Sequence, residues 1–116
     1  MSENEKYAIL IEPELQQVSL VPVDGEVRFK QFYEVLDCST IEIVQLRQGV
    51  DMLCDEEGYF VDGNPIFYID IDEDRIFRQI VGKSVIVKNV GPDLYGWTIP
   101  EIEELVSQIK IKWSKK

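Results

Sequence analysis

Short apolar runs, each closed by a turn signal, constrain the fold of this chain most strongly. Runs of about four to eight residues are typical of strands, and alternation of apolar with polar residues predicts a strand with one buried face. Gly, Pro and Asp residues between the runs favour turns. The predicted strands cover residues 7–11 and 17–23, which form a hairpin, then 40–46, 50–54 and 83–88; residues 66–71 form either a strand or an irregular apolar segment.

Helical spacing replaces the strand pattern in residues 27–37. Apolar side chains there recur at i, i+3, i+4 and i+7, which places them on one face of a helix. A second, short helix is expected to be capped by Asp72 or Asp74 and to end at Gly82. The side chains on the predicted face of the first helix are Phe29, Phe32, Tyr33 and Leu36.

The last predicted helix has the clearest start signal. Thr98 and Glu101 have the spacing of a capping box, with a proline in the first turn. Lys110 and Lys112 would lie near the helix C-terminus, where the macrodipole favours positive charge. The apolar face of this helix is Ile102, Leu105, Val106 and Ile109.

The fold class expected from these elements is α+β in a single domain of 116 residues. Two amphipathic helices need a sheet on which to bury their apolar faces, so we expect an antiparallel or mixed sheet of about five strands, packed by two main helices and one short helix. Residues 1–6 are expected to form a polar N-terminal tail, and residues 110–116 a basic C-terminal tail.

The chain contains no histidine. This absence removes the Ser-His-Asp and Cys-His nucleophile arrangements and the usual zinc sites, because two cysteines cannot supply four ligands. Glycine motifs that bind nucleoside triphosphates or dinucleotides are also missing. Cys38 and Cys54 are expected to be small buried hydrophobic residues rather than redox partners. We therefore predict no cofactor and a protein that is not an enzyme.

Asp70, Asp72 and Asp74 are the candidate metal ligands. At a spacing of two they would share one face of a strand, and carboxylates suit a hard cation such as Mg²⁺ or Ca²⁺. Counted from Asp70, the calcium-binding loop pattern requires glycine at its sixth position and glutamate at its twelfth. These positions hold Arg75 and Val81, so the pattern does not match. The alternative is a solvated turn that caps a helix. A carboxylate- or metal-dependent enzyme is one hypothesis.

The formal net charge is −10, from 22 acidic and 12 basic residues. An acidic surface repels nucleic acid and attracts basic partners. A second hypothesis is an acidic protein that imitates the charge of nucleic acid and inhibits a defence or DNA-processing enzyme. Weak nucleic-acid binding is expected only at the C-terminal lysines, which are Lys110, Lys112, Lys115 and Lys116.

The N-terminal segment carries no targeting signal that the sequence pattern reveals. Residues 1–6 lack the basic and apolar regions of a signal peptide. No apolar run approaches the ~18 residues that a membrane helix needs. We therefore expect a cytoplasmic protein without membrane contact.

Several segments of the chain carry a resemblance to a known family. They are the strands at 40–46 and 50–54, the Asp-Glu-Glu-Gly turn at 55–58, the Asn-Pro loop at 64–65 and the Ile-Val-Gly-x-x-Val-Ile-Val segment at 80–87. Together they resemble a small uncharacterised domain family of bacteria, phages and mobile elements. The likeness spans residues 7–108 and implies a similar element order, without an activity. The family places Pro before Asn in the loop, whereas here Asn precedes Pro. The positions that the resemblance marks are Asp55, Glu56, Gly58, Asn64 and Gly82.

The leading functional hypothesis is a non-catalytic protein-interaction module of bacterial or phage origin. Aromatic residues in loop-like stretches either form a partner-binding patch or anchor the loops to the core. The candidate interaction residues are Asp55, Glu56, Asn64, Tyr95 and Trp97.

Overall fold

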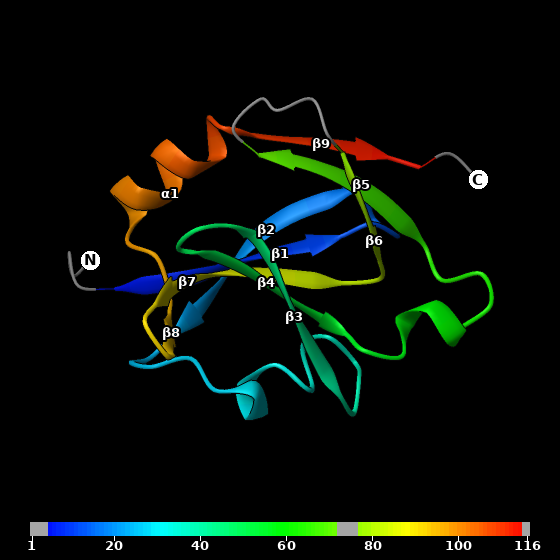
Figure 1. Ribbon diagram of the computed structural model, residues 1–116, viewed down its shortest axis with the longest axis horizontal. Coiled ribbons are helices and arrows are strands. Elements are labelled where there is room, and N and C mark those ends of the chain that lie inside the picture. The colour runs from blue at the N-terminus through cyan, green and yellow to red at the C-terminus, as the bar shows by residue number, and fades with distance from the viewer. Residues whose placement is uncertain (1–4, 72–76, 115–116) are drawn as a thin grey trace.

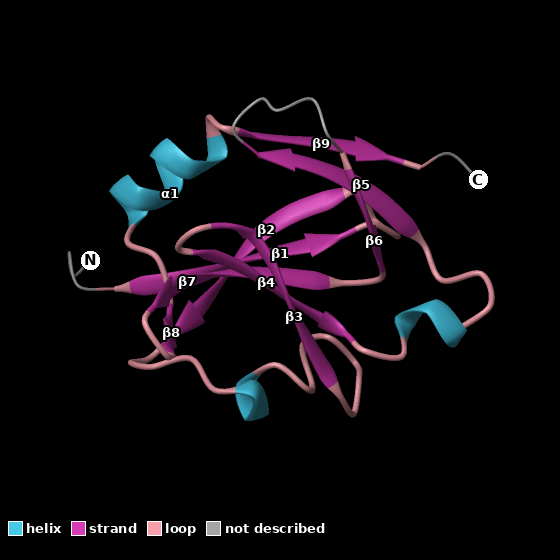
Figure 2. Ribbon diagram, viewed as in Figure 1, coloured by secondary structure: helices cyan, strands magenta, loops and turns pink. Residues whose placement is uncertain are grey.

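The computed structural model describes residues 5–71 and 77–114, which form two antiparallel sheets, one α-helix and two short 3-10 helices. Strands dominate the ribbon (Figure 1 and Figure 2). No helix of the described residues is long and apolar enough to cross a membrane. The strands are β1 (Lys6–Glu12), β2 (Gln17–Val23), β3 (Ile41–Arg47), β4 (Val50–Asp55), β5 (Ile66–Ile71), β6 (Arg78–Val81), β7 (Ser84–Val90), β8 (Asp93–Tyr95) and β9 (Ile109–Trp113), and the α-helix is α1 (Ile99–Val106).

The larger sheet is built around β7. Its strand order is β2-β1-β7-β4-β3, and β8 pairs with the end of β7. All neighbouring strands are antiparallel. β1 and β2 form the predicted hairpin, with Lys6 opposite Val23 and Glu12 opposite Gln17. The five strands predicted without an alternative are thus confirmed, within one or two residues at most of their ends.

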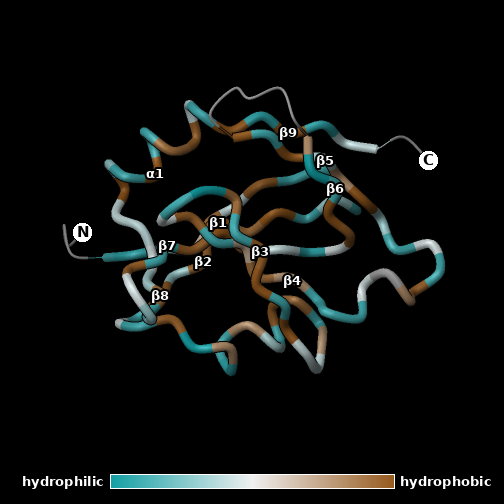
Figure 3. Tube along the Cα trace, in the orientation of Figure 1, coloured by the Kyte–Doolittle hydropathy of each residue, from teal (hydrophilic) through white to brown (hydrophobic). Residues whose placement is uncertain are grey.

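One face of the larger sheet packs against the smaller sheet and α1, which lie at the top of Figure 1. Ile9, Ile86 and Met52 lie opposite one another on β1, β7 and β4, so their side chains share this face. The smaller sheet has the order β6-β5-β9, and residues 66–71 therefore form a strand. Phe67 on β5 is fully buried in the same cluster. Hydrophobic and hydrophilic stretches alternate along these strands (Figure 3).

The opposite face of the larger sheet is covered by residues 24–40, which run along the bottom of Figure 1. Phe32 and Leu36 of this segment are buried in one cluster with Leu53 of β4 and Val85 of β7. Because both faces of the sheet are covered, its central strands are apolar on both sides.

The predicted helix over residues 27–37 is wrong. Regular structure there is limited to a 3-10 turn at Phe29–Gln31, which is followed by further turns. The valine and aromatic residues of this segment are weak helix formers, so packing on the sheet decides its path. The spacing still identified Phe32 and Leu36 as core residues, with 1% and 4% of their surface exposed.

The C-terminal helix is shorter than predicted. α1 ends at Val106, and Ile109–Trp113, expected in the helix end and the basic tail, form β9 against β5. Isoleucine and lysine alternate at period two in this segment, which is strand spacing. Lys110 and Lys112 therefore lie on a strand, opposite Asp70 and Tyr68 of β5.

The short helix predicted to end at Gly82 is also not seen. Residues 78–81 form β6 instead, with Ile80 opposite Phe67. The expected caps, Asp72 and Asp74, lie outside the described residues. The fold is therefore mostly β, and the expected α+β arrangement with two main helices is wrong, because a second sheet with α1 covers one face of the larger sheet and a largely non-helical segment covers the other.

The predicted start of α1 is confirmed. The backbone N–H of Glu101 donates to Thr98 Oγ1 at 3.4 Å, and the N–H of Thr98 donates to Glu101 Oε1 at 2.9 Å. Lys88 on β7 forms an ion pair with the same carboxylate at 2.6 Å. Burial alone would raise the pKa of Glu101, but the hydrogen bonds from Lys88 and Thr98 lower it below its ordinary value. The capping box thus also ties α1 to the sheet.

Replacing Phe32 with Ala tests whether residues 24–40 are a true cover of the sheet. Phe32 is 1% exposed, and we expect Phe32→Ala to lower the free energy of unfolding by about 3–5 kcal/mol, because it leaves a cavity. The neighbouring Tyr33 is 37% exposed, so Tyr33→Ala should cost about 1 kcal/mol or less. Urea unfolding of both variants measures the difference. Equal losses would show that the segment does not pack as described.

Candidate functional site

Two adjoining hollows lie beside the loop that leads from β4 to β5. One of about 440 Å³ is lined by Cys38, Glu57 and Phe60, and the other, of about 310 Å³, by Asn64 and Lys83 among others. The two hollows share a wall formed by Asp37, Asp55 and Val61. We call the residues Asp37, Asp55, Glu57, Phe60 and Val61 the acidic groove.

The turn after β4 places the carboxylates of the groove. Asp55 ends β4, and its Oδ1 accepts a hydrogen bond of 2.9 Å from the backbone N–H of Glu57. Aspartate favours such turns because its short side chain reaches the backbone two residues on. The backbone N–H of Glu56 donates to the carbonyl of Thr40 at 3.3 Å, which ties the turn to the start of β3. The following 3-10 turn, Gly58–Phe60, carries Phe60 outward with 83% of its surface exposed.

Asn64 holds the other end of this loop. Its Nδ2 donates to the carbonyl of Gly58 at 3.1 Å, and the backbone N–H of Gly82 donates to the carbonyl of Pro65 at 2.8 Å. A Cβ on Gly82 would lie 3.2 Å from Asn64 Nδ2, and Gly82 has a φ of +82°. Glycine is thus required at 82 by both its backbone and its neighbour. Three positions marked by the resemblance, Gly58, Asn64 and Gly82, meet here as one structural junction.

The groove is electronegative. Asp37, Asp55 and Glu57 form no ion pair with any of the described residues. Burial raises the pKa of the Cys38 thiol, and the charges of Asp55 and Asp37 raise it further. The thiol is therefore less reactive than a free cysteine, because only the thiolate is nucleophilic. These features suit binding of a positive group and do not suit a cysteine nucleophile.

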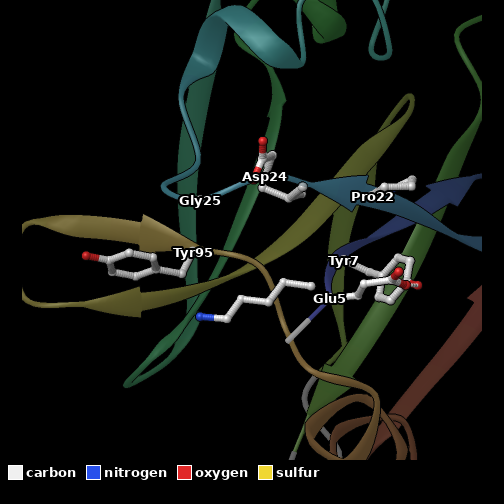
Figure 4. Close-up of a pocket in the computed structure, with 8 residues that line it drawn as sticks. Glu5, Tyr7, Pro22, Asp24, Gly25 and Tyr95 are labelled. Carbon is white, nitrogen blue, oxygen red and sulfur yellow. Dashed lines mark hydrogen bonds between the residues drawn. The ribbon is translucent and has the colours of Figure 1, made fainter. Parts of the chain in front are cut away.

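The other candidate interaction residues lie elsewhere. Trp97 is buried in the core, where its Nε1–H donates to the carbonyl of Ile86 at 3.2 Å. Tyr95 lines a separate open hollow of about 810 Å³. Figure 4 shows Tyr95 on one side of this hollow and Tyr7 and Pro22 on the other. The Tyr7 hydroxyl, in the same hollow, already donates to the Glu5 carboxylate at 2.6 Å. The structure thus brings Asp55 and Asn64 together at one hollow, with Glu56 next to Asp55 in the turn, and places Tyr95 and Trp97 elsewhere.

The candidate metal ligands are not assembled in the described part of the chain. Asp70 is 3% exposed on β5, opposite Lys110 of β9. Asp72 and Asp74 lie outside the described residues. Within residues 5–71 and 77–114, no group of three metal-ligating side chains occurs.

Sequence reasoning missed the role of Asp37 in the groove. It lies in the turns that end the segment covering the sheet, with a φ of +53°. Because residues 37 and 55 are brought together only by the packing of this segment on β4, no spacing rule could pair them. Phe60, an aromatic residue in a polar loop, is the one sequence signal for a surface site here.

Substituting Gly82 tests the junction with Asn64. We expect Gly82→Ala to lower the free energy of unfolding by more than the ~1–2 kcal/mol that a positive φ costs alone. Gly25→Ala is the matched control, since Gly25 has a φ of +73° and open space around it. In an Asn64→Ala background the cost of Gly82→Ala should fall to the level of the control. Urea unfolding measures all four variants, and equal costs at 82 and 25 in the native background would contradict the proposed packing.

Cys54 makes the stability depend on pH. Burial, followed by the charges of Glu42 and Asp55, raises the pKa of the Cys54 thiol to about 12. The unfolded thiol ionises near pH 9, so between about pH 9 and pH 12 the unfolded state loses a proton that the folded state keeps. The free energy of unfolding should therefore fall as pH rises through this window. Urea unfolding should show a smaller fall for Cys54→Ala, and identical pH profiles would contradict this assignment.

Comparison with known protein families identifies one relationship. No curated protein and no solved structure matches the chain. The sequence profile of the DUF3846 family, described as a domain of unknown function, matches residues 5–108. The expected membership of an uncharacterised domain family is thereby confirmed, while the individual motif positions stay a prediction. The chain belongs to the DUF3846 family of domains of unknown function.

Proposed function

We propose that this protein is a protein-interaction module whose acidic groove binds a basic segment of a partner protein that also carries an apolar side chain. The observation that supports this most directly is Phe60, which is 83% exposed beside carboxylates that have no ion-pair partner among the described residues. The resemblance suggests a bacterial or phage setting for this interaction.

Phe60 and Val61 supply the apolar part of the proposed contact. They are adjacent in the chain, and 83% and 54% of their surfaces are exposed. Removing apolar surface from water stabilises a complex by about 25 cal/mol per Å², and aromatic side chains are frequent among the residues that dominate binding energy. A partner that covers Phe60 would therefore gain more binding free energy than a partner that contacts only the carboxylates.

The carboxylates orient the bound partner and determine which partners can bind. Asp37, Asp55 and Glu57 lie around the same hollow as Phe60, within a chain of net charge −10. Complementary charge speeds association and rejects partners of like charge. Phosphate groups would be repelled, so a lysine- or arginine-bearing polypeptide fits better than a nucleic acid. The exposed aromatic side chain beside the charges favours this role over imitation of nucleic acid, which would need charge alone.

A labelled peptide of alternating lysine and leucine is the probe, with its glutamate counterpart as the negative control. We expect the basic peptide to bind more weakly as salt rises, since screening reduces the attraction. Phe60→Ala should raise its Kd about tenfold, because truncating a central aromatic typically costs more than 1 kcal/mol. Fluorescence anisotropy measures both effects.

Matched variants separate the groove from general acidity. Asp37→Asn, Asp55→Asn and Glu57→Gln together should weaken binding, whereas Glu42→Gln, Glu103→Gln and Glu104→Gln remove the same charge from exposed sites elsewhere. Ile43→Ala, at a residue 47% exposed on β3, controls for Phe60→Ala. Equal weakening by the two triple variants would contradict a specific groove.

A further inference from the structure

β2 is an open edge of the larger sheet. It pairs only with β1 among the described strands, and nothing follows it in the strand order. Its sequence, Gln-Val-Ser-Leu-Val-Pro-Val, contains no charged residue. An unpaired strand edge presents free backbone groups to other strands, and natural proteins usually protect such an edge with charge, a proline, a bulge or a covering element. In β2 a proline, Pro22, stands at one end of the strand only.

The other described edge strands, β3, β6, β8 and β9, all carry charge, which Asp93 supplies on β8. β3 carries Glu42 and Arg47, shifts register at a bulge between residues 45 and 47, and accepts a hydrogen bond from the Arg78 guanidinium at the carbonyl of Gln45. The edges of the smaller sheet carry Arg78 on β6 and lysines at alternate positions on β9. Of the described edge strands in both sheets, β2 is the one without charge.

The backbone groups that β2 directs outward can be identified from its neighbour. Tyr7 donates to the carbonyl of Trp97 at 2.8 Å and accepts from the N–H of Trp97 at 2.7 Å, so its polar backbone groups point away from β2. Pro22 lies opposite Tyr7 and therefore faces the open edge. Because the pattern alternates, Val18 and Leu20 also direct their N–H and C=O outward. Pro22 has no N–H and limits the usable edge to the residues before it.

The side chains of the same residues are incompletely covered. Val18 and Leu20 lie opposite Ile11 and Ile9, so they share the face of the main core, yet 46% and 41% of their surfaces are exposed. Leu15 in the turn before β2 is 62% exposed. The open edge therefore combines free backbone groups with apolar side chains that a further strand would cover.

We propose that two copies of this chain pair β2 to β2 in antiparallel orientation, about a two-fold axis at Ser19. Val18 of each copy then lies opposite Leu20 of the other, and each such pair exchanges both of its backbone hydrogen bonds. The ladder uses the outward N–H groups of Val18 and Leu20 and needs none from Pro22. The larger sheets of the two copies become one continuous sheet.

Charge favours a second copy of this chain as the partner that pairs with β2. A body of net charge −10 repels its own copies, so self-association requires a neutral contact. β2 provides that contact, and symmetry places Val18 beside Leu20 twice with no charge between them. The other described strands at sheet edges carry charges that a pairing with β2 would have to bury.

Oligomeric state tests the proposal. Light scattering after gel filtration, over a range of protein concentrations, should show a species of twice the 13.5 kDa chain mass. Association should strengthen with added salt, because screening reduces repulsion between the acidic bodies. This trend is opposite to that expected for a basic peptide in the acidic groove, so the two proposals fail independently. A monomer at all concentrations and salt levels would overturn the paired edge.

Lysines on the edge should prevent pairing. Val18→Lys with Leu20→Lys should give a folded monomer, as checked by circular dichroism. Ile43→Lys, on the exposed part of β3, is the matched control and should stay dimeric. Loss of the dimer in both variants, or in neither, would overturn the assignment to β2.

A cysteine at the two-fold axis tests the register of the proposed β2–β2 pairing. In the proposed pairing Ser19 lies opposite itself at a non-hydrogen-bonded position, where Cα atoms are ~4.5 Å apart and within disulfide range. Ser19→Cys should therefore form a cross-linked dimer under mild oxidation, seen on a non-reducing gel. Gln17→Cys would lie opposite Val21 and should not cross-link, and the wild-type chain controls for Cys38 and Cys54. Cross-linking at 17 but not at 19 would overturn this register.

Discussion

The fold depends on a strand that cannot face water on either side. Residues Ser84 to Val87 of β7 have no exposed surface, and β7 lies between β1 and β4 in the larger sheet. A strand that is apolar on both faces requires a layer above and a layer below. The smaller sheet with α1 supplies one layer, and residues 24–40 supply the other. The rest of the chain connects these covers.

The acidic groove lies where the end of one cover meets the loop that leads to the other. Asp37 and Cys38 come from the end of the segment that covers one face, whereas residues 55–61 belong to the chain that crosses to the smaller sheet. The crossing loop is held at both ends, by the Asp55 turn and by the Asn64 junction with Gly58 and Gly82. A loop so anchored can hold Phe60 in water without support from the core. The outermost strand, β2, is only partly covered, with Val18 46% and Leu20 41% exposed.

Strand positions were predictable because their signal is local. The runs that became β1, β2, β3, β4 and β7 show apolar spacing and turn residues that do not depend on distant contacts. The Thr98 capping box was equally local, since both partners lie within one turn. The error over residues 27–37 has a different origin. The period of buried side chains in that segment matches a helix, but its residues favour no helix strongly, and contacts with Leu53 and Val85 determine the backbone.

By itself the sequence determined the strands β1, β2, β3, β4 and β7, the turns between them and the start of α1, because backbone stereochemistry and hydrophobic spacing act over a few residues. Only the tertiary structure decided that Ile109–Trp113 pairs with β5, and that Asp37 meets Asp55 at a groove beside Phe60. It also decided that β2 ends the sheet as its uncharged edge. Pairing between distant strands depends on which surfaces remain uncovered once the central strands are buried, and no local pattern contains that information.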